Sequence, residues 1–155
     1  MRIFRAAAMF LAFAQPADAG GMAWRGGGDE LNAELRYGTA DKSDTPISFH
    51  CTPHVDIVYV AYFFRPANAT EAMETEFTLS AGGIDIHVDA IGYQILLDDS
   101  FVLEGQIAFD RVFRDFIASG GILTATAEGK AETFPLDGAK ENAGPLLEMC
   151  GREVD

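Results

Sequence analysis

The sequence has 155 residues, of which 48% are hydrophobic, and its formal net charge at pH 7 is −13. This apolar content is enough for one packed domain and excludes an intrinsically disordered chain. The negative charge disfavours binding to nucleic acid and to anionic lipid, because both repel an acidic protein. A solvated acidic surface is the more common meaning of such a charge, and a binding surface for a cationic partner is the other.

Residues 1–19 have the features of a secretory signal peptide. Arg2 and Arg5 precede a short apolar run over residues 6–14, and Ala17-Asp18-Ala19 matches an A-x-A cleavage site. The apolar run is too short to cross a bilayer as a helix, which argues against an uncleaved anchor. We therefore predict cleavage after residue 19, no membrane insertion of the mature chain, and a location in the periplasm of a Gram-negative bacterium or outside the cell.

The mature chain is predicted to begin with a flexible leader and to continue as one domain. Residues 20–30 are rich in glycine, which is typical of a mobile segment. Trp24 lies within this leader, and it either docks on the domain or moves with the leader. Residues 31–155 are expected to form a single domain.

That domain is predicted to be mainly β. Strand patterns occur at residues 33–37, 47–51, 55–64, 74–80, 84–91, 93–97, 101–107, 122–127 and 131–134. The segment 55–64 is apolar on both faces after Asp56, which predicts a central strand covered on both sides. Asp98-Asp99-Ser100 separates two strand patterns and predicts a hairpin turn.

Two helices are expected near the end of the chain. Residues 109–119 carry an apolar stripe with helical spacing, and Gly120-Gly121 ends that pattern. The stripe consists of Phe109, Val112, Phe113, Phe116 and Ile117. It predicts a helix that packs on the core. Pro145 is suited to the first turn of a second, short helix that reaches Cys150.

The stretch "SFHCTPHVD" at residues 48–56 places two histidines beside a cysteine, as in a metal site or one end of a disulfide. Side chains alternate along a strand, so Cys51 is expected to point into the core and His50 away from it, with His54 in a turn. Cys150 is the only other cysteine, and exported proteins form disulfides. A structural zinc site would need four converging ligands. We therefore predict a Cys51–Cys150 disulfide, with no metal and no cofactor.

No sequence motif predicts a catalytic site. The chain lacks G-x-S-x-G, H-E-x-x-H and a phosphate-binding glycine loop, and its two cysteines are expected to be paired. A second candidate is a cation site or an acid/base pair formed by Asp85, His87 and Asp89 on the polar side of one strand, together with the Asp98-Asp99 turn. It would suit a small hydrolase or a cation-dependent carbohydrate binder. Chance clustering is the more common explanation in so acidic a chain.

The C-terminal third carries a family resemblance. Phe134, Leu136 and Gly138 form an "F-x-L-x-G" turn that is followed by a short helical segment and Cys150, with the partner Cys51 far upstream. This pattern resembles a loose group of exported bacterial proteins that includes invasion-associated locus B proteins, the type VI secretion-associated protein VasI and uncharacterised alphaproteobacterial relatives. The resemblance implies a disulfide-tied β-sandwich that binds or assembles, and it implies no catalytic residue.

The expected protein is therefore an antiparallel β-sandwich with two short helices and one disulfide. Its expected function is that of a non-enzymatic periplasmic or secreted binding module that contacts another cell-envelope protein. The alternative is the small hydrolase or carbohydrate binder that would use Asp85, His87, Asp89 and the Asp98-Asp99 turn.

Overall fold

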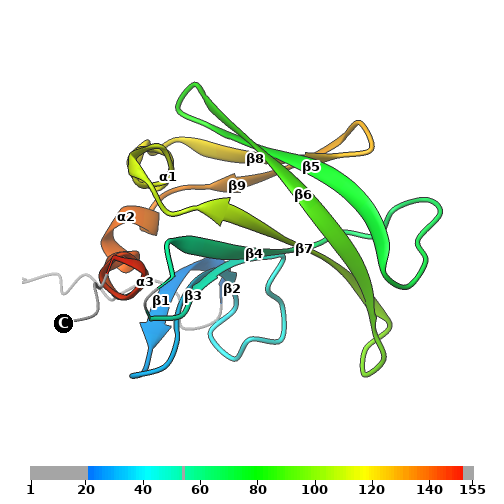
Figure 1. Ribbon diagram of the computed structural model, residues 1–155, viewed down its shortest axis with the longest axis horizontal. Coiled ribbons are helices and arrows are strands. Elements are labelled where there is room, and N and C mark those ends of the chain that lie inside the picture. The colour runs from blue at the N-terminus through cyan, green and yellow to red at the C-terminus, as the bar shows by residue number, and fades with distance from the viewer. Residues whose placement is uncertain (1–20, 54, 152–155) are drawn as a thin grey trace, which may run out of the picture.

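The computed structural model describes residues 21–53 and 55–151, which form nine antiparallel strands in one curled sheet and three short helices (Figure 1). The predicted signal peptide, its cleavage site and His54 lie outside the described residues. The elements are β1 (Ala23–Gly28), β2 (Ala33–Gly38), β3 (Ile47–Cys51), β4 (Ile57–Phe63), β5 (Met73–Ala81), β6 (Ile84–Ile95), β7 (Ser100–Ala108), α1 (Arg111–Ala118), β8 (Ile122–Ala127), β9 (Lys130–Pro135), α2 (Ala139–Asn142) and α3 (Gly144–Cys150).

The sheet has the strand order β1-β2-β3-β4-β7-β6-β5-β8-β9 and curls so that its two halves face each other (Figure 1). Aromatic side chains join the halves across the core. Tyr62 on β4 packs on Phe77 of β5 with ring centroids 5.4 Å apart, and Tyr37 on β2 packs on Phe134 of β9 at 5.6 Å. The predicted mainly β fold is confirmed. The sandwich is confirmed in part, because one continuous sheet supplies both of the faces that pack together.

Strand β4 lies between β3 and β7, so its predicted central position is confirmed. The prediction that both of its faces are covered is wrong. Val58, Val60 and Tyr62 are buried, whereas Tyr59 on the other face is 40% exposed. The helices gather at one end of the curled sheet and leave the outer side of β4 uncovered (Figure 1).

The glycine-rich segment is an edge strand, so the predicted flexible leader is wrong for residues 23–28. Trp24 is buried, packs near the rings of Tyr37 and Phe49, and donates a hydrogen bond from Nε1 to the carbonyl oxygen of Pro135 at 2.7 Å. A Cβ atom at Gly26 would collide with the backbone carbonyl of Asn142 in α2. Glycine therefore serves close packing between β1 and α2 rather than mobility.

The two strands predicted at residues 84–91 and 93–97 are one long strand, β6. Gly92 lies inside this strand, and a Cβ atom there would meet the ring of Phe101 at 2.5 Å. The glycine therefore marks tight packing between neighbouring strands and not a break. The predicted hairpin is confirmed, but its turn lies over residues 96–99 because Ser100 already belongs to β7.

The predicted amphipathic helix is confirmed as α1. The Asp110 side chain caps it by accepting a hydrogen bond from the backbone N–H of Phe113. Phe113, Phe116 and Ile117 are buried, whereas Val112 is half exposed. The short C-terminal helix is confirmed as α3, with a proline in its first turn. It packs against β1, β2 and β3.

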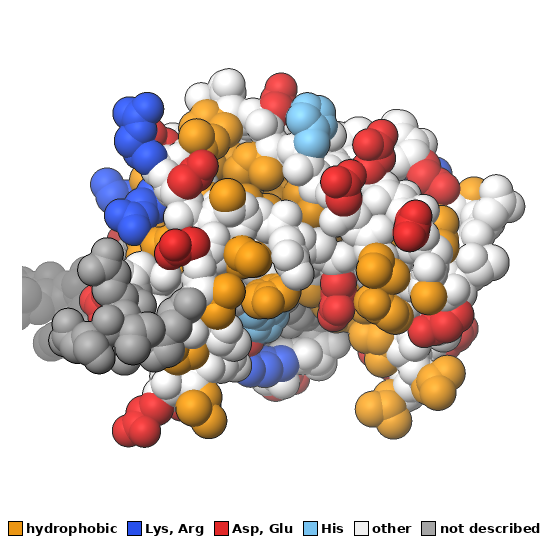
Figure 2. All heavy atoms as spheres, in the orientation of Figure 1, with side chains coloured by type: hydrophobic (Ala, Val, Ile, Leu, Met, Phe, Trp, Pro, Cys, Tyr) orange, Lys and Arg blue, Asp and Glu red, His pale blue; other side chains and the backbone are white. Residues whose placement is uncertain are grey.

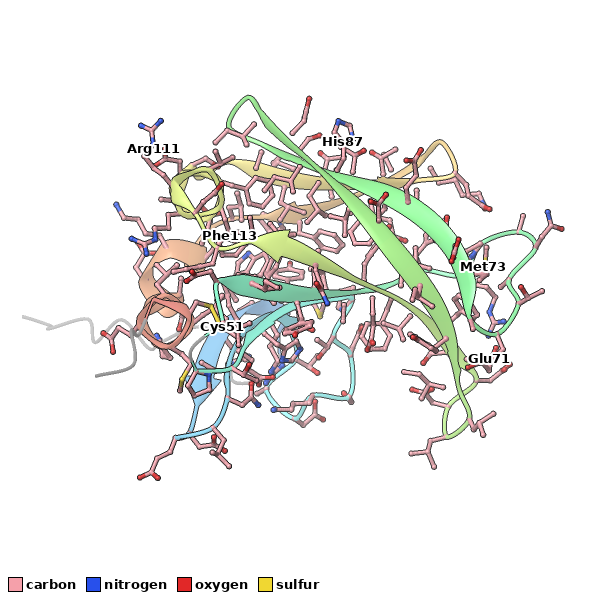
Figure 3. The ribbon with its side chains drawn as sticks, in the orientation of Figure 1. Cys51, Glu71, Met73, His87, Arg111 and Phe113 are labelled. Carbon is pink, nitrogen blue, oxygen red and sulfur yellow. A yellow bond between two sulfur atoms is a disulfide. The ribbon has the colours of Figure 1, made fainter. Side chains whose placement is uncertain are left out.

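The predicted disulfide is confirmed. Cys51 at the end of β3 is bonded to Cys150 at the end of α3, with Cα atoms 5.5 Å apart and a sequence separation of 99. Both cysteines are buried, and Cys51 lies where the sheet meets the helices (Figure 3). The bond therefore ties the C-terminal helix to the sheet. Within the described part of the chain, no helix has the length and apolar character needed to cross a membrane.

Candidate functional site

Two open hollows lie side by side on the outer side of β3, β4, β7, β6 and β5, with volumes of about 580 and 360 Å³. They share Glu104 and Gly105 of β7. The larger hollow is lined among others by Glu74, His87, Asp89, Ile91 and Gln106, and the smaller by His50, Tyr59 and Ala61. We refer to the surface formed by Tyr59, Glu74, Asp89, Ile91 and Glu104 as the acidic face.

The strand register explains this surface. Ile91 on β6 is paired with Glu104 on β7 and with Glu74 on β5. Adjacent strands lie about 4.8 Å apart and paired side chains share a face, so the two carboxylates flank the isoleucine. Ile91 is 42% exposed, a value close to that of Tyr59. The acidic face thus has an apolar centre and an acidic border, and acidic side chains gather over this part of the molecule in Figure 2.

The carboxylates of the acidic face have no basic partner among residues 21–53 and 55–151. Within that part of the chain, Lys, Arg or His nitrogens lie within 4.0 Å of only two acidic residues, Glu34 and Asp99. The negative charge of Glu74, Asp89 and Glu104 therefore meets solvent without an internal counter-charge. A cationic ligand could pair with these groups without first displacing an existing ion pair.

A polar cluster adjoins the smaller hollow on β2 and β3. Glu34 accepts a hydrogen bond from Lys42 Nζ at 2.8 Å and lies 3.4 Å from Arg36 Nε and 4.0 Å from His50 Nδ1. Burial alone would raise the pKa of Glu34, but the hydrogen bond and charge of Lys42 and the charges of His50 and Arg36 lower it. Burial lowers the pKa of His50, although the carboxylates of Glu34 and Glu104 act in the opposite direction.

Sequence reasoning missed the combination of Ser48, His50 and Glu34. Ser48 Oγ lies 2.9 Å from His50 Nε2, and the other ring nitrogen faces Glu34. These residue types also occur in hydrolase triads, but Ser48 is only 5% exposed, and the contact between Nδ1 and the carboxylate is longer than a hydrogen bond. Strand β3 is paired on both sides, so its backbone N–H groups serve the sheet and not an oxyanion hole. This arrangement therefore gives no basis for acyl transfer.

The second candidate set from the sequence is not brought together. Asp85, His87 and Asp89 lie on the exposed side of β6 as predicted, and His87 projects from the sheet in Figure 3. The turn that carries Asp98 and Asp99 begins after Ile95, roughly 20 Å along the strand from Asp89 at about 3.3 Å per residue. The Asp98 side chain accepts hydrogen bonds from Ser100, and the Asp99 side chain accepts one from Gln94 and lies 3.5 Å from Arg65 Nη2. The geometry thus gives no support to a hydrolase or carbohydrate site built from these five residues.

His87 and Asp89 do lie together in the larger hollow with Glu74 and Glu104. The His87 ring is engaged by Thr78, whose Oγ1 is 3.0 Å from Nδ1. Among the described residues, no three His, Cys, Asp or Glu side chains are arranged to hold a metal ion. The hollow is therefore a surface of separated charges and not a set of converging ligands.

No protein-family model, curated protein or solved structure matches this chain. The resemblance to invasion-associated locus B proteins and their relatives stays a prediction from the sequence.

Proposed function

We propose that the protein is an exported, non-enzymatic binding module whose acidic face docks a cationic segment of another cell-envelope protein. The observation that carries the proposal is the placement of exposed Ile91 between Glu74 and Glu104, with exposed Tyr59 in the adjoining hollow. Protein interfaces commonly combine an apolar or aromatic centre with a charged rim.

Charge supports a cationic partner. The acidic face carries three carboxylates that have no ion pair within the described residues, and the whole chain has a net charge of −13. Such a field attracts a basic surface from solution and orients it before contact. Burial of Ile91 and Tyr59 would then supply the short-range stabilisation, since aliphatic and aromatic side chains lose their contact with water on binding.

Export is supported by the disulfide and by the signal-peptide pattern at residues 1–19. A buried disulfide is typical of proteins from oxidising compartments such as the periplasm. Amino-terminal sequencing of the protein from its native host should start at Gly20, after the A-x-A site. An intact Met1 on the soluble protein would contradict export by this route.

The binding proposal is tested by photo-crosslinking in the native host. A photoreactive benzoylphenylalanine placed at Tyr59 should give a discrete adduct with one envelope protein, because this side chain would be buried on docking. The same group at Val112, a similarly exposed residue on α1, serves as the control and should give no such adduct.

The adduct must also depend on charge. Its yield should fall at high salt, since ionic screening weakens attraction between surface charges. Equal crosslinking from positions 59 and 112, or no adduct from position 59, would contradict docking at the acidic face.

A further inference from the structure

The turn between β6 and β7 carries the two most exposed of the large hydrophobic side chains in the described part of the chain. Leu96 is 90% exposed and Leu97 is 98% exposed. In Figure 1 this turn projects from the sheet on the side away from the helices, and hydrophobic side chains cover its tip in Figure 2. Single exposed apolar residues are common on protein surfaces, but two adjacent leucines at a projecting tip form a contiguous apolar patch.

Polar side chains make several hydrogen bonds within the turn. Asp98 Oδ1 accepts hydrogen bonds from the backbone N–H and the hydroxyl of Ser100, at 3.1 and 2.7 Å. Gln94 Nε2 donates to Asp99 Oδ1 at 2.8 Å and to the Ser100 carbonyl oxygen at 3.1 Å. A preformed tip loses little conformational entropy on binding, so more of the free energy gained by burying the leucines is retained.

A neighbouring loop supports the same turn from the side. Arg65 Nη2 donates to the Asp99 carbonyl oxygen at 2.6 Å, and the backbone N–H of Gln94 donates to Glu71 Oε2 at 3.0 Å. Glu71 lies beside the β6–β7 hairpin in Figure 3. The leucines are therefore presented by a hairpin that is braced by the segment preceding β5.

Charge around the tip indicates the kind of surface that it fits. Asp98 and Asp99 follow the leucines in the turn, and Glu71 accepts a hydrogen bond from the Gln94 backbone beside it. Arg65 is the one described basic residue within 4.0 Å of these carboxylates. A membrane with anionic lipids would repel this border, and so would a second copy of a chain with net charge −13. An apolar pocket with a basic rim on another protein matches both the leucines and the carboxylates.

We infer that residues 96–99, which we name the leucine turn, form a second docking element that inserts into a basic-rimmed apolar pocket of a partner protein. The leucine turn lies at the end of the β6–β7 hairpin, and its own contacts hold it there. It does not depend on the acidic face, and either element could act without the other.

The test begins with a photoreactive benzoylphenylalanine at Leu97 in the protein made in its native host. The inference requires a discrete protein adduct, whose partner is then identified, purified and titrated with the mature protein. Replacing both leucines, Leu96→Ser with Leu97→Ser, should weaken binding to that partner at least tenfold. Added salt should weaken the wild-type complex, since ionic screening weakens attraction between surface charges.

Leu31→Ser is the matched control, since Leu31 is 76% exposed on the turn between β1 and β2 and is not part of the leucine turn. The affinity of the Leu31→Ser variant for the identified partner should stay within twofold of the wild-type affinity. Equal affinities for the leucine double variant and the wild type would overturn the inference, as would the absence of any adduct. An adduct of twice the chain's own mass would identify a second copy as the occupant and would also overturn it.

A vesicle experiment separates a protein partner from a membrane. The mature protein is sedimented with vesicles of phosphatidylcholine, and separately with vesicles containing phosphatidylglycerol. We expect no sedimentation with either composition beyond that of the Leu96→Ser, Leu97→Ser double variant. Sedimentation of the wild type alone would show that the leucines enter lipid, and the inference would be wrong.

Discussion

The helical end of the molecule and the side formed by β5, β6 and β7 use apolar residues in opposite ways. At the helical end, Trp24, Leu146 and the Cys51–Cys150 bond are buried between β1, β3 and the C-terminal helices. On the other side, Ile91 and the two leucines of the leucine turn are exposed to solvent. The first region is packed and cross-linked, and the second consists of paired strands with a hydrogen-bonded turn.

This difference separates residues that maintain the fold from residues that are free to bind. Removing a buried group from the helical end takes away contacts on which several elements depend. Changing Leu96 or Leu97 takes away almost no contact within the chain, because both side chains are almost fully exposed. Variants of the first kind should therefore lose stability, and variants of the second kind should lose binding while they stay folded.

The largest expected loss of stability follows removal of the disulfide. Cys51→Ser should lower the free energy of unfolding by about 4 kcal/mol, because the bond closes a loop with a sequence separation of 99 and thereby restricts the unfolded chain. Cys150→Ser and the double variant should lose similar amounts, since each lacks the same bond. Denaturant unfolding measures all three. Clearly unequal losses among them would show that one of the cysteines stabilises the fold in some other way.

A smaller loss is expected where β1 meets α2. Gly26→Ala should lower the free energy of unfolding by about 1–3 kcal/mol, because the new methyl group would collide with the backbone carbonyl of Asn142. Gly27→Ala is the matched control in the same strand, since a Cβ atom there has no neighbour within 4 Å. Thermal unfolding should separate the two variants. If both behave alike, β1 does not pack tightly on the helix.

Much of the helical end could be predicted from the sequence, because burial leaves a periodic pattern. The alternation of apolar and polar residues along the strand predicted that Cys51 points into the core, and helical spacing predicted the apolar stripe that includes Phe113. The two cysteines allowed only one disulfide pairing. The role of Gly26 could not be predicted, since glycine is common both in mobile segments and in tight contacts. Its neighbour Asn142 is far away in sequence.

Less of the outer surface could be predicted from the sequence. Glu74, Ile91 and Glu104 lie on three different strands, and only the register of β5, β6 and β7 brings them together. The predicted strand at residues 93–97 also included Leu96 and Leu97, because apolar residues favour strands. β6 ends at Ile95, and no neighbouring residue in the sequence indicates that the two leucines are exposed. From the sequence alone, apolar residues in an exposed turn cannot be distinguished from apolar residues in a buried strand.

The polar cluster beside the smaller hollow should make stability depend on pH. Burial holds the pKa of His50 below its ordinary value, so the unfolded chain takes up a proton first as the pH falls below about 6.5. Stability should therefore decrease through that range, and His50→Gln should remove this part of the decrease. Unfolding measured between pH 7.5 and 5.5 tests the sign. An increase in wild-type stability towards pH 5.5 would contradict it.

Glu34 should act at lower pH. Its pKa is lowered, so its stabilising contribution is present above the ordinary glutamate value and is lost as the pH falls through the folded-state value. Glu34→Gln should flatten the stability profile below about pH 4.5 and enlarge the histidine-dependent decrease, because the Glu34 carboxylate opposes the lowering of the pKa of His50. The same unfolding series, extended to pH 3, provides the measurement. An unchanged acid profile would show that the contact with Lys42 does not persist in solution.

The smallest effect on stability is expected at the leucine turn. The double variant Leu96→Ser, Leu97→Ser should change the free energy of unfolding by no more than about 0.5 kcal/mol, because both side chains are already in water. Leu146→Ala at the helical end should cost about 2–5 kcal/mol, because that leucine is completely buried. Denaturant unfolding of the two proteins measures the contrast. A loss above 2 kcal/mol in the double variant would show that the turn packs on the fold.

The central claim, that the acidic face binds a cationic partner, is tested most directly by two double variants with equal net charge. Glu74→Gln with Glu104→Gln changes the acidic face, whereas Glu141→Gln with Glu148→Gln removes the same charge from exposed positions on α2 and α3. Both are titrated against the partner that crosslinks at position 59. Binding at least tenfold weaker for the first variant and within about twofold of the wild type for the second is the expected result. An equal loss of affinity in both double variants would show that only the overall charge matters, and it would contradict a defined docking face.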